Sequence, residues 1–198
     1  MNIRHLEMPL TEDDLRSLRV GDIVTLSGIL WTCGSRFHVR TIEEGIAPPI
    51  DTRKHNVMLY SEPIVSRRDD DWKIRAASIT ASSRFERWEP AAIESLGIRA
   101  VAGKGKVGRK TLEAMKRFGC IHLIRCGLFP GSFVSMMKRI QEVHWLDLGL
   151  PEALWVIEVA QLGPFIVEAD LSGESLYETL GKKLDEKIPR IYERHLTG

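Results

Sequence analysis

The sequence predicts an α/β fold in which a strand-rich first half packs against a mainly parallel sheet built from the second half. From residue 74 onward, an apolar run, a polar loop and a helical stretch follow one another three times. This alternation is typical of parallel strands joined by crossover helices. The first half instead carries β-branched runs between glycine and proline turns. We therefore expect a layered β/β/α architecture.

The length and composition limit both the size and the class of the protein. With 198 residues, 43% of them hydrophobic, the chain can bury one core but not two large ones, so a single domain over residues 1–198 is expected. Lysine and arginine total 28 against 27 acidic residues, and this balance gives no electrostatic footprint for nucleic acid or an anionic membrane. Without an apolar leader or a stretch near the ~18 residues of a membrane span, a cytoplasmic protein is expected.

The first half is expected to contain one short helix and two strands. Thr11 can cap a helix over residues 11–18, whose first turn carries two carboxylates. A β-branched run predicts a strand at residues 23–31, and residues 32–36 resemble a polar loop leaving that strand. A second strand is expected at residues 57–60.

The second half is expected to contain three strand–loop–helix units and a C-terminal helix. The strands of the units are predicted at 74–79, 98–101 and 121–124. The helices that follow them are predicted at 90–96, 111–118 and 133–140, two of them ended by glycine. Further strands are expected at 143–145, 155–159 and 165–167. The helix predicted at 173–196 has apolar residues at helical spacing, which indicates a packing face: Leu176, Leu180, Leu184, Ile188 and Ile191.

The three cysteines do not form a recognisable metal or disulfide motif. Cys33, Cys120 and Cys126 are odd in number and match neither a disulfide framework nor a C-x2-C site. An iron–sulfur cluster needs three or four thiolates. We therefore expect reduced thiols and no cluster bound by this chain.

A glycine-rich loop at residues 103–111 is similar to a phosphate-binding loop. Where that motif requires lysine, however, Arg109 stands, and Lys110 comes one residue late, about 100° around a helix. Two interpretations stay open: a basic solvated loop, or Lys104 as an anion anchor between two flexible glycines. A weaker alternative is a polyanion-binding module that uses Lys104, Lys106, Arg109 and Lys110.

Two other polar segments could bind a small anion. The segment from Thr80 to Arg84 combines hydroxyls with a guanidinium, which binds carboxylates bidentately. An ordinary polar turn is the alternative. His38 lies in a predicted polar loop beside Arg36 and Arg40, so it could carry a proton. A surface or supporting role is the alternative for this histidine.

In their order and spacing, several segments resemble the beta subunit or C-terminal domain of class I (iron–sulfur) fumarases and L-tartrate dehydratases. The resemblance covers about residues 8–178. The segments that carry it are Pro9-Leu10-Thr11, Val20 to Gly28, Ala102-Gly103-Lys104-Gly105, Asp147-Leu148-Gly149 and Glu152-Ala153-Leu154-Trp155.

The resemblance implies a swivelling β/β/α domain and a hydro-lyase reaction on a small dicarboxylate of the fumarate/malate or tartrate type. A 4Fe-4S cluster is expected in a partner alpha subunit, where it would act as a Lewis acid on the substrate hydroxyl. This chain would complete the active site, belong to an oligomer and be inactive alone.

Site residues follow from matching the family's motifs. The Gly-Pro-Thr-Thr-x-x-Arg segment aligns with residues 78–84, which implies that Thr80 is the catalytic hydroxyl and Arg84 a substrate-binding group. The lysine of the Gly-Lys-Gly motif aligns with Lys104. In the Thr-x-Arg-Asp-x-x-His segment, the histidine aligns with His38.

Two departures favour a rival interpretation, a catalytically altered paralogue that binds a ligand or partner without hydratase activity. Gly34 stands where the family has a substrate arginine, and only Arg36, two residues on, offers a replacement. Ala81 stands where the family has its second threonine.

Overall fold

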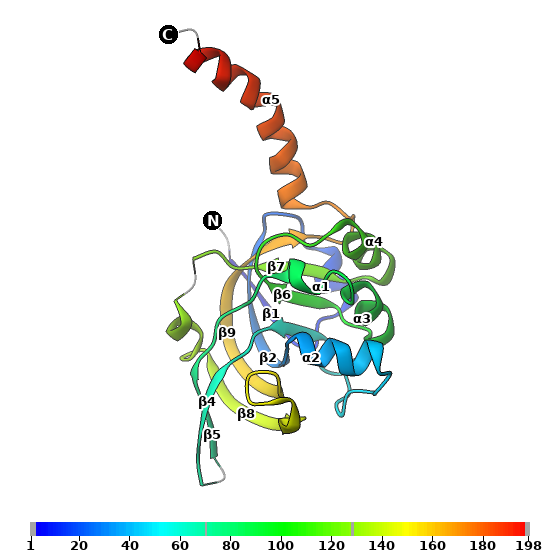
Figure 1. Ribbon diagram of the computed structural model, residues 1–198, viewed down its shortest axis with the longest axis vertical. Coiled ribbons are helices and arrows are strands. Elements are labelled where there is room, and N and C mark those ends of the chain that lie inside the picture. Colours follow the sequence, from blue (N-terminus) through cyan, green and yellow to red (C-terminus); the bar gives the residue numbers. More distant parts are fainter. Residues whose placement is uncertain (1–2, 70, 128, 197–198) are drawn as a thin grey trace.

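The chain folds as a mixed α/β structure around one large sheet (Figure 1). The computed structural model describes residues 3–69, 71–127 and 129–196. Over these residues, seven strands pair in the order β1-β2-β3-β6-β7-β9-β8. In chain order their bounds are Ile3–Glu7 (β1), Ile23–Cys33 (β2), Val57–Tyr60 (β3), Ala100–Gly103 (β6), Ile121–Ile124 (β7), Met137–His144 (β8) and Leu154–Ala169 (β9).

The sheet is mostly parallel, as the sequence predicts. Strands β1, β2, β3, β6 and β7 pair with their neighbours in parallel. The parallel part nevertheless begins in the first half of the chain, which corrects the prediction that it belongs to the second half. Strand β9 is antiparallel to β8, β7 and β2. Because β9 pairs with both β2 and β7, the strands from β2 to β9 in this order form a closed sheet.

One predicted strand of the repeating units lies outside this sheet. Residues 74–79 were expected to be a strand followed by a helix, but β5 (Asp71–Ala76) pairs with β4 (Ile64–Arg68) in a separate antiparallel hairpin. This hairpin projects from the body of the molecule (Figure 1). Only a single bridge, between Ser61 and Ile79, connects the predicted strand to the end of β3.

The helix predicted at residues 133–140 is wrong. A 3-10 helix, Pro130–Phe133, is followed after a turn of three residues by β8. Apolar residues at 133, 136, 137 and 140 have helical spacing, but pairing of β8 with β9, from Met137 opposite Val159 to His144 opposite Leu154, determines the outcome. Tertiary pairing therefore overrides the local pattern.

Helices α1 (Glu12–Arg16), α3 (Glu89–Leu96) and α4 (Arg109–Phe118) form close to their predicted positions, whereas α2 (Ser35–His38) forms where a polar loop was expected. Helix α1 is capped by Thr11, and α2 continues into one π-helical turn, Val39–Glu43. Helices α3 and α4 both end at a left-handed glycine, as predicted.

Two apolar clusters hold the body together. One includes Leu26, Leu123 and Phe165 beside residues from β1, β2, β6, β7 and β9. The second packs α2, α3 and α4 against the strands and includes Trp31 and Met115. The sheet therefore has apolar cover on both faces, as its parallel part requires.

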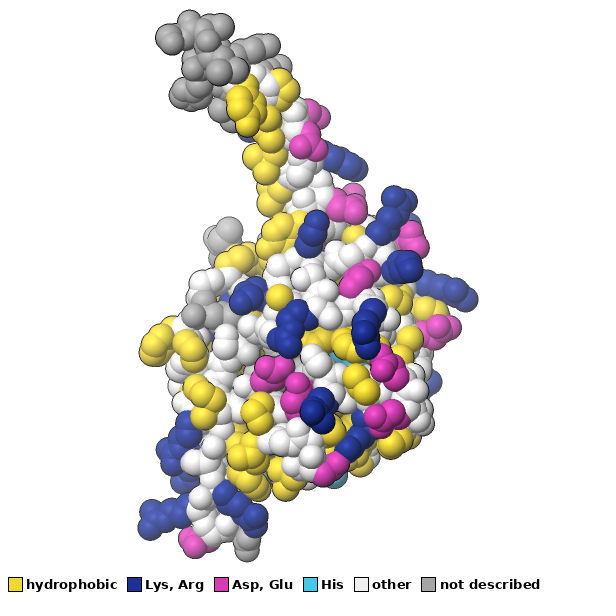
Figure 2. All heavy atoms as spheres, viewed as in Figure 1, with side chains coloured by type: hydrophobic (Ala, Val, Ile, Leu, Met, Phe, Trp, Pro, Cys, Tyr) yellow, Lys and Arg dark blue, Asp and Glu magenta, His cyan; other side chains and the backbone are white. Residues whose placement is uncertain are grey.

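Helix α5 (Leu176–Leu196) extends away from this body (Figure 1). The helix begins three residues after the predicted start. Of its predicted packing face, Leu176 at the start of the helix is half-buried, whereas Leu180, Leu184 and Ile188 have exposed fractions of 44%, 55% and 41% and do not pack against the described part of the body. The side chain of Ile191 lies outside what the structure describes. Figure 2 shows the apolar stripe along the helix. No helix among the described residues is long and apolar enough to cross a membrane.

Candidate active site

Three loops that follow parallel strands meet at one edge of the sheet. These loops follow β2, β3 and β6, and the carboxyl ends of parallel strands are where such sheets bind ligands. The turn that carries Thr80 and Arg84 follows the hairpin strand β5 and lies against the ends of β3 and β6. The backbone N–H of Thr80 donates to the carbonyl of Tyr60 at the end of β3 (2.9 Å), and that of Lys104 donates to the carbonyl of Thr80 (3.0 Å). Ala81 forms a parallel bridge with Lys104. The turn from Thr80 is therefore anchored beside Lys104.

Arg84 and Thr80 are in direct contact. Nη1 of Arg84 donates to Oγ1 of Thr80 at 2.9 Å. Nη2 lies 3.4 Å from Oγ of Ser35 and 3.8 Å from a carboxylate oxygen of Glu62. Because the Arg84 side chain is 47% exposed, its guanidinium retains donors for an incoming carboxylate. Lys104 is exposed as well, and its backbone hydrogen bond to Thr80 places the three residues that family motifs indicate on adjoining segments.

The loop after β2 is built around Glu152. A carboxylate oxygen of Glu152 accepts from the backbone N–H of Arg36 at 3.0 Å. A Cβ added to Gly34 would lie 2.2 Å from the same side chain. The family's arginine therefore has no room at position 34 unless Glu152 moves. Arg36 is exposed on α2, and no described contact joins its side chain to Thr80 or Arg84.

The prediction that His38 lies in a polar loop is wrong. His38 ends α2, and its side chain has an exposed fraction of 0%. Its ring stacks on Trp88, with 5.6 Å between centroids, and Nε2 lies 3.3 Å from Sγ of Cys33. Burial lowers the pKa of His38 to about 3. The ring is therefore neutral and out of reach of solvent in this conformation.

The N-terminus of α4 is occupied by a carboxylate of the chain itself. Glu86 accepts from the backbone N–H of Gly108 and from Oγ1 of Thr111, both at 2.7 Å. These donors are the ones that a phosphate would need. The phosphate-loop interpretation of residues 103–111 therefore fails, because Glu86 already fills that position.

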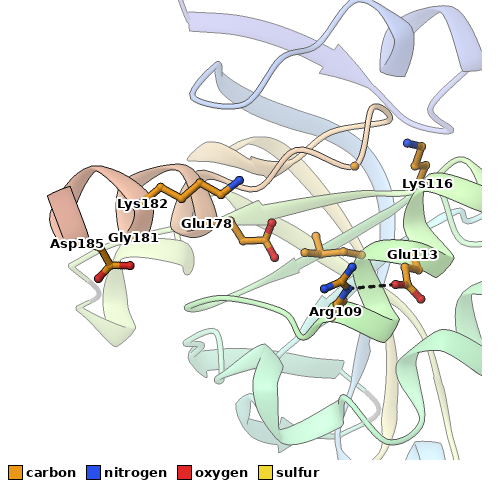
Figure 3. A pocket seen from close by; sticks show the side chains of 9 residues that line it. Arg109, Glu113, Lys116, Glu178, Gly181, Lys182 and Asp185 are labelled. Carbon is orange, nitrogen blue, oxygen red and sulfur yellow. Dashed lines mark hydrogen bonds and ion pairs between the residues drawn. The ribbon is translucent and has the colours of Figure 1, made fainter.

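A cavity beside α4 is separate from the candidate site. It has a volume of about 620 Å³ and lies between α4 and α5, where Figure 3 shows acidic and basic side chains alternating around it. Arg109 is paired there with Glu113 at 3.3 Å. Mixed charge of this kind does not favour a polyanion.

The three cysteines lie in different chemical environments. Cys33 and Cys120 are buried and Cys126 is exposed. Burial raises the pKa of the Cys33 and Cys120 thiols well above their ordinary value, which disfavours the thiolate that a metal requires. Throughout the part of the chain that is described, no three His, Cys, Asp or Glu side chains are grouped to hold a metal ion.

Sequence reasoning did not identify several polar residues beside or beneath the site. Glu86 and Glu152 lie in loops, where an acidic residue carries no distinctive signal. His122 stands within the otherwise apolar strand β7, and Glu168 lies in the apolar run that ends β9; both are fully buried. A lone titratable residue in an apolar strand was a signal available in the sequence.

In sequence, the chain is similar to the C-terminal part of fumarases. The Fumarase C-terminus family model matches residues 2–180, and the chain belongs to this family. The resemblance predicted from the sequence is thereby confirmed.

Similar proteins include subunits and a longer chain. The L(+)-tartrate dehydratase subunit beta of Escherichia coli (strain K12) is 35% identical over 192 residues, covering 95% of this chain and 93% of that protein. A Methanocaldococcus jannaschii protein named "Putative L(+)-tartrate dehydratase subunit beta" is 33% identical over 186 residues, covering 92% of this chain and 95% of that protein. A Geobacillus stearothermophilus protein named "Putative fumarate hydratase class I" is 31% identical, covering 95% of this chain but 36% of that longer protein.

Proposed function

We propose that this chain is the beta subunit of an iron–sulfur hydro-lyase that adds or removes water on a small dicarboxylate of the fumarate/malate or tartrate type. The names of the similar proteins support the reaction class. The observation that carries the proposal is the contact between the Arg84 guanidinium and the Thr80 hydroxyl at 2.9 Å, on a turn anchored to Lys104.

Each of the three residues has a role suited to its chemistry. Arg84 binds a substrate carboxylate through two parallel N–H donors. Thr80 transfers the proton on the substrate carbon. A threonine hydroxyl is a weak base at neutral pH, so the positive charges of Arg84 and Lys104 stabilise its alkoxide-like state. Arg36, exposed on the neighbouring loop, is a further candidate for the second carboxylate.

The remaining chemistry is assigned to a cytoplasmic alpha subunit that assembles with this chain in an oligomer. Its 4Fe-4S cluster supplies a Lewis acid for the substrate hydroxyl when bound. The exposed position of Arg84 and Lys104 suits a site that is completed by another subunit. On this proposal, the isolated chain binds substrate weakly and does not turn it over.

A second candidate function is ligand or partner binding without hydratase activity. It is favoured by Gly34, because Glu152 occupies the space of the family's substrate arginine. Ala81 in place of a threonine adds to this argument. The two candidates differ in whether a cluster-bearing partner makes the chain active.

Anaerobic reconstitution tests the proposal. The chain is to be co-expressed with the cluster-bearing subunit from its native source, and fumarate, malate and tartrate are to be assayed with the complex and with each subunit alone. We expect turnover of one dicarboxylate by the complex only. Turnover by the isolated chain would contradict the two-subunit proposal, and a stable complex that is inactive on all dicarboxylates would favour the altered paralogue.

A further inference from the structure

A chain of hydrogen bonds runs through the core from the candidate active site to the start of α5. Oγ of Ser82 lies 2.8 Å from Nε2 of His122 on β7. Nδ1 of the same ring lies 2.8 Å from Oε2 of Glu168 on β9. Ser175 donates from Oγ to Oε1 of Glu168 at 2.5 Å. Ser82, His122 and Glu168 have exposed fractions of 0%, and Ser175 is buried as well.

Each side chain in this series of hydrogen bonds has a partner within the series. Glu168 accepts the hydroxyl proton of Ser175 through Oε1 and contacts Nδ1 of His122 through Oε2. Nε2 of His122 is then directed at the hydroxyl of Ser82. In a low-dielectric interior such bonds are strong, and a missing partner leaves a costly unpaired group. The position of the Ser82 hydroxyl is therefore determined from within the core.

The order serine, histidine, carboxylate is also that of a hydrolytic triad, but the burial excludes that role. A nucleophilic hydroxyl must reach a substrate atom. The Ser82 side chain has no exposed surface, and its hydroxyl points at His122 inside the sheet. The three residues therefore have a structural role within the protein and do not react with a substrate.

Ser82 connects the core to all three candidate site residues. Its backbone N–H donates to the carbonyl of Lys104 at 3.0 Å, and it stands two residues from both Thr80 and Arg84. Gly103 makes room for its hydroxyl, because a Cβ at that position would lie 2.0 Å from Oγ of Ser82. The glycine before Lys104 and the serine of the turn are thus a matched pair.

We propose that Ser82, His122 and Glu168 are positioning residues that hold the turn from Thr80 to Arg84 against Lys104. This inference rests on the proposed function of that site. A turn fixed before substrate arrives loses less conformational freedom on binding. Loss of the Ser82 hydroxyl therefore weakens binding more than it slows the chemical step.

The central experiment compares Ser82→Ala with Ser95→Ala, because Ser95 is exposed and its hydroxyl donates to the carbonyl of Ala91 within α3. In the reconstituted complex, we expect Ser82→Ala to raise KM about tenfold, the equivalent of one hydrogen bond, with a smaller change in kcat. In the full-length chain alone, amide hydrogen exchange over residues 80–84 should accelerate, and the His122 ring 15N shifts should change. Ser95→Ala should leave all three measurements unchanged.

A second pair of variants separates positioning from general damage. Gly103→Ala should disturb exchange in the turn and raise KM, because its methyl group displaces the Ser82 hydroxyl. In the Ser82→Ala background, Gly103→Ala should add much less, since the 2.0 Å clash with Oγ is gone and the remaining neighbours of the added Cβ are Tyr60 at 3.1 Å and the Cβ of residue 82 at 3.4 Å. His122→Gln can unfold the chain by leaving Glu168 unpaired, so the serine and glycine variants carry the test.

The outcomes distinguish this inference from the proposed function. Native KM in Ser82→Ala, with or without faster exchange, would overturn the positioning role, and so would strict additivity of the two variants. If Thr80→Ala and Arg84→Ala instead kept full activity, the proposed function would fail. Exchange measured on the isolated chain would still report whether Ser82 holds the turn.

Discussion

Individual residues at the site owe their arrangement to neighbours distant in sequence. The hydroxyl and guanidinium of Thr80 and Arg84 meet within one turn, whereas the backbone on which they stand is anchored by Tyr60 and Lys104. The side chain of Glu152 occupies the space that a side chain at position 34 would need. The candidate site therefore combines one local contact with several long-range ones.

Replacement of Thr80 by alanine should lower turnover far more than it weakens substrate binding. A group that transfers a proton acts mainly in the transition state and contributes roughly 10²–10⁴-fold. Steady-state kinetics of the reconstituted complex would show this as a fall in kcat at similar KM. Thr80→Ser, which keeps a hydroxyl, is the matched control. Full turnover in Thr80→Ala would place the proton carrier elsewhere.

Replacement of Arg84 by alanine should instead chiefly raise KM. A charge-assisted hydrogen bond is worth about 1.5–3 kcal/mol, which corresponds to a loss of roughly ten- to a hundredfold in affinity. Arg87 is a suitable control, because it pairs with Glu43 rather than Thr80. Similar KM values for Arg84→Ala and Arg87→Ala would argue against a carboxylate clamp at Arg84.

At the scale of elements, the parts predicted well from sequence are those whose signals are local. The strand and helix between residues 98 and 118 were marked by an apolar run and a terminal glycine, and both are present. Residues 133–140 were misassigned because β8 is determined by pairing with β9. The site residues Thr80, Arg84 and Lys104 came from family motifs, since their contacts across β3 and β6 leave no periodic pattern.

The N-terminus of α4 should depend on Glu86 for stability. Its carboxylate both accepts from the first turn and complements the positive end of the helix dipole. Glu86→Gln should therefore lower the free energy of unfolding by about 1 kcal/mol, measured in urea. Glu113→Gln on the same helix removes only an exposed pair with Arg109 and should cost less. Equal losses would show that Glu86 is not the cap.

At the scale of the whole molecule, folding buries a titratable carboxyl group, that of Glu89 on α3. Glu89 has an exposed fraction of 0%, and its carboxyl group lies near the buried Tyr60 hydroxyl. Burial, followed by the nearby charges of Glu86 and Glu168, raises the pKa of Glu89 to about 8; the Tyr60 hydroxyl opposes this only in part. The fold therefore carries a proton at neutral pH that the unfolded chain releases.

This difference predicts how stability varies with pH. The unfolded carboxyl ionises near its ordinary pKa of 4.5, whereas the folded one does so near 8. Between these values the folded state binds more protons, so the contribution of Glu89 is fully present below pH 4.5 and is lost as the pH rises through 8. Urea unfolding across this range should show that Glu89→Gln removes that loss, a difference on the order of a few kcal/mol at high pH. The exposed neighbour Glu94 on α3 provides the control, since Glu94→Gln should follow the unmodified chain at every pH. A constant difference between Glu89→Gln and the unmodified chain would mean that Glu89 is ionised in the folded protein.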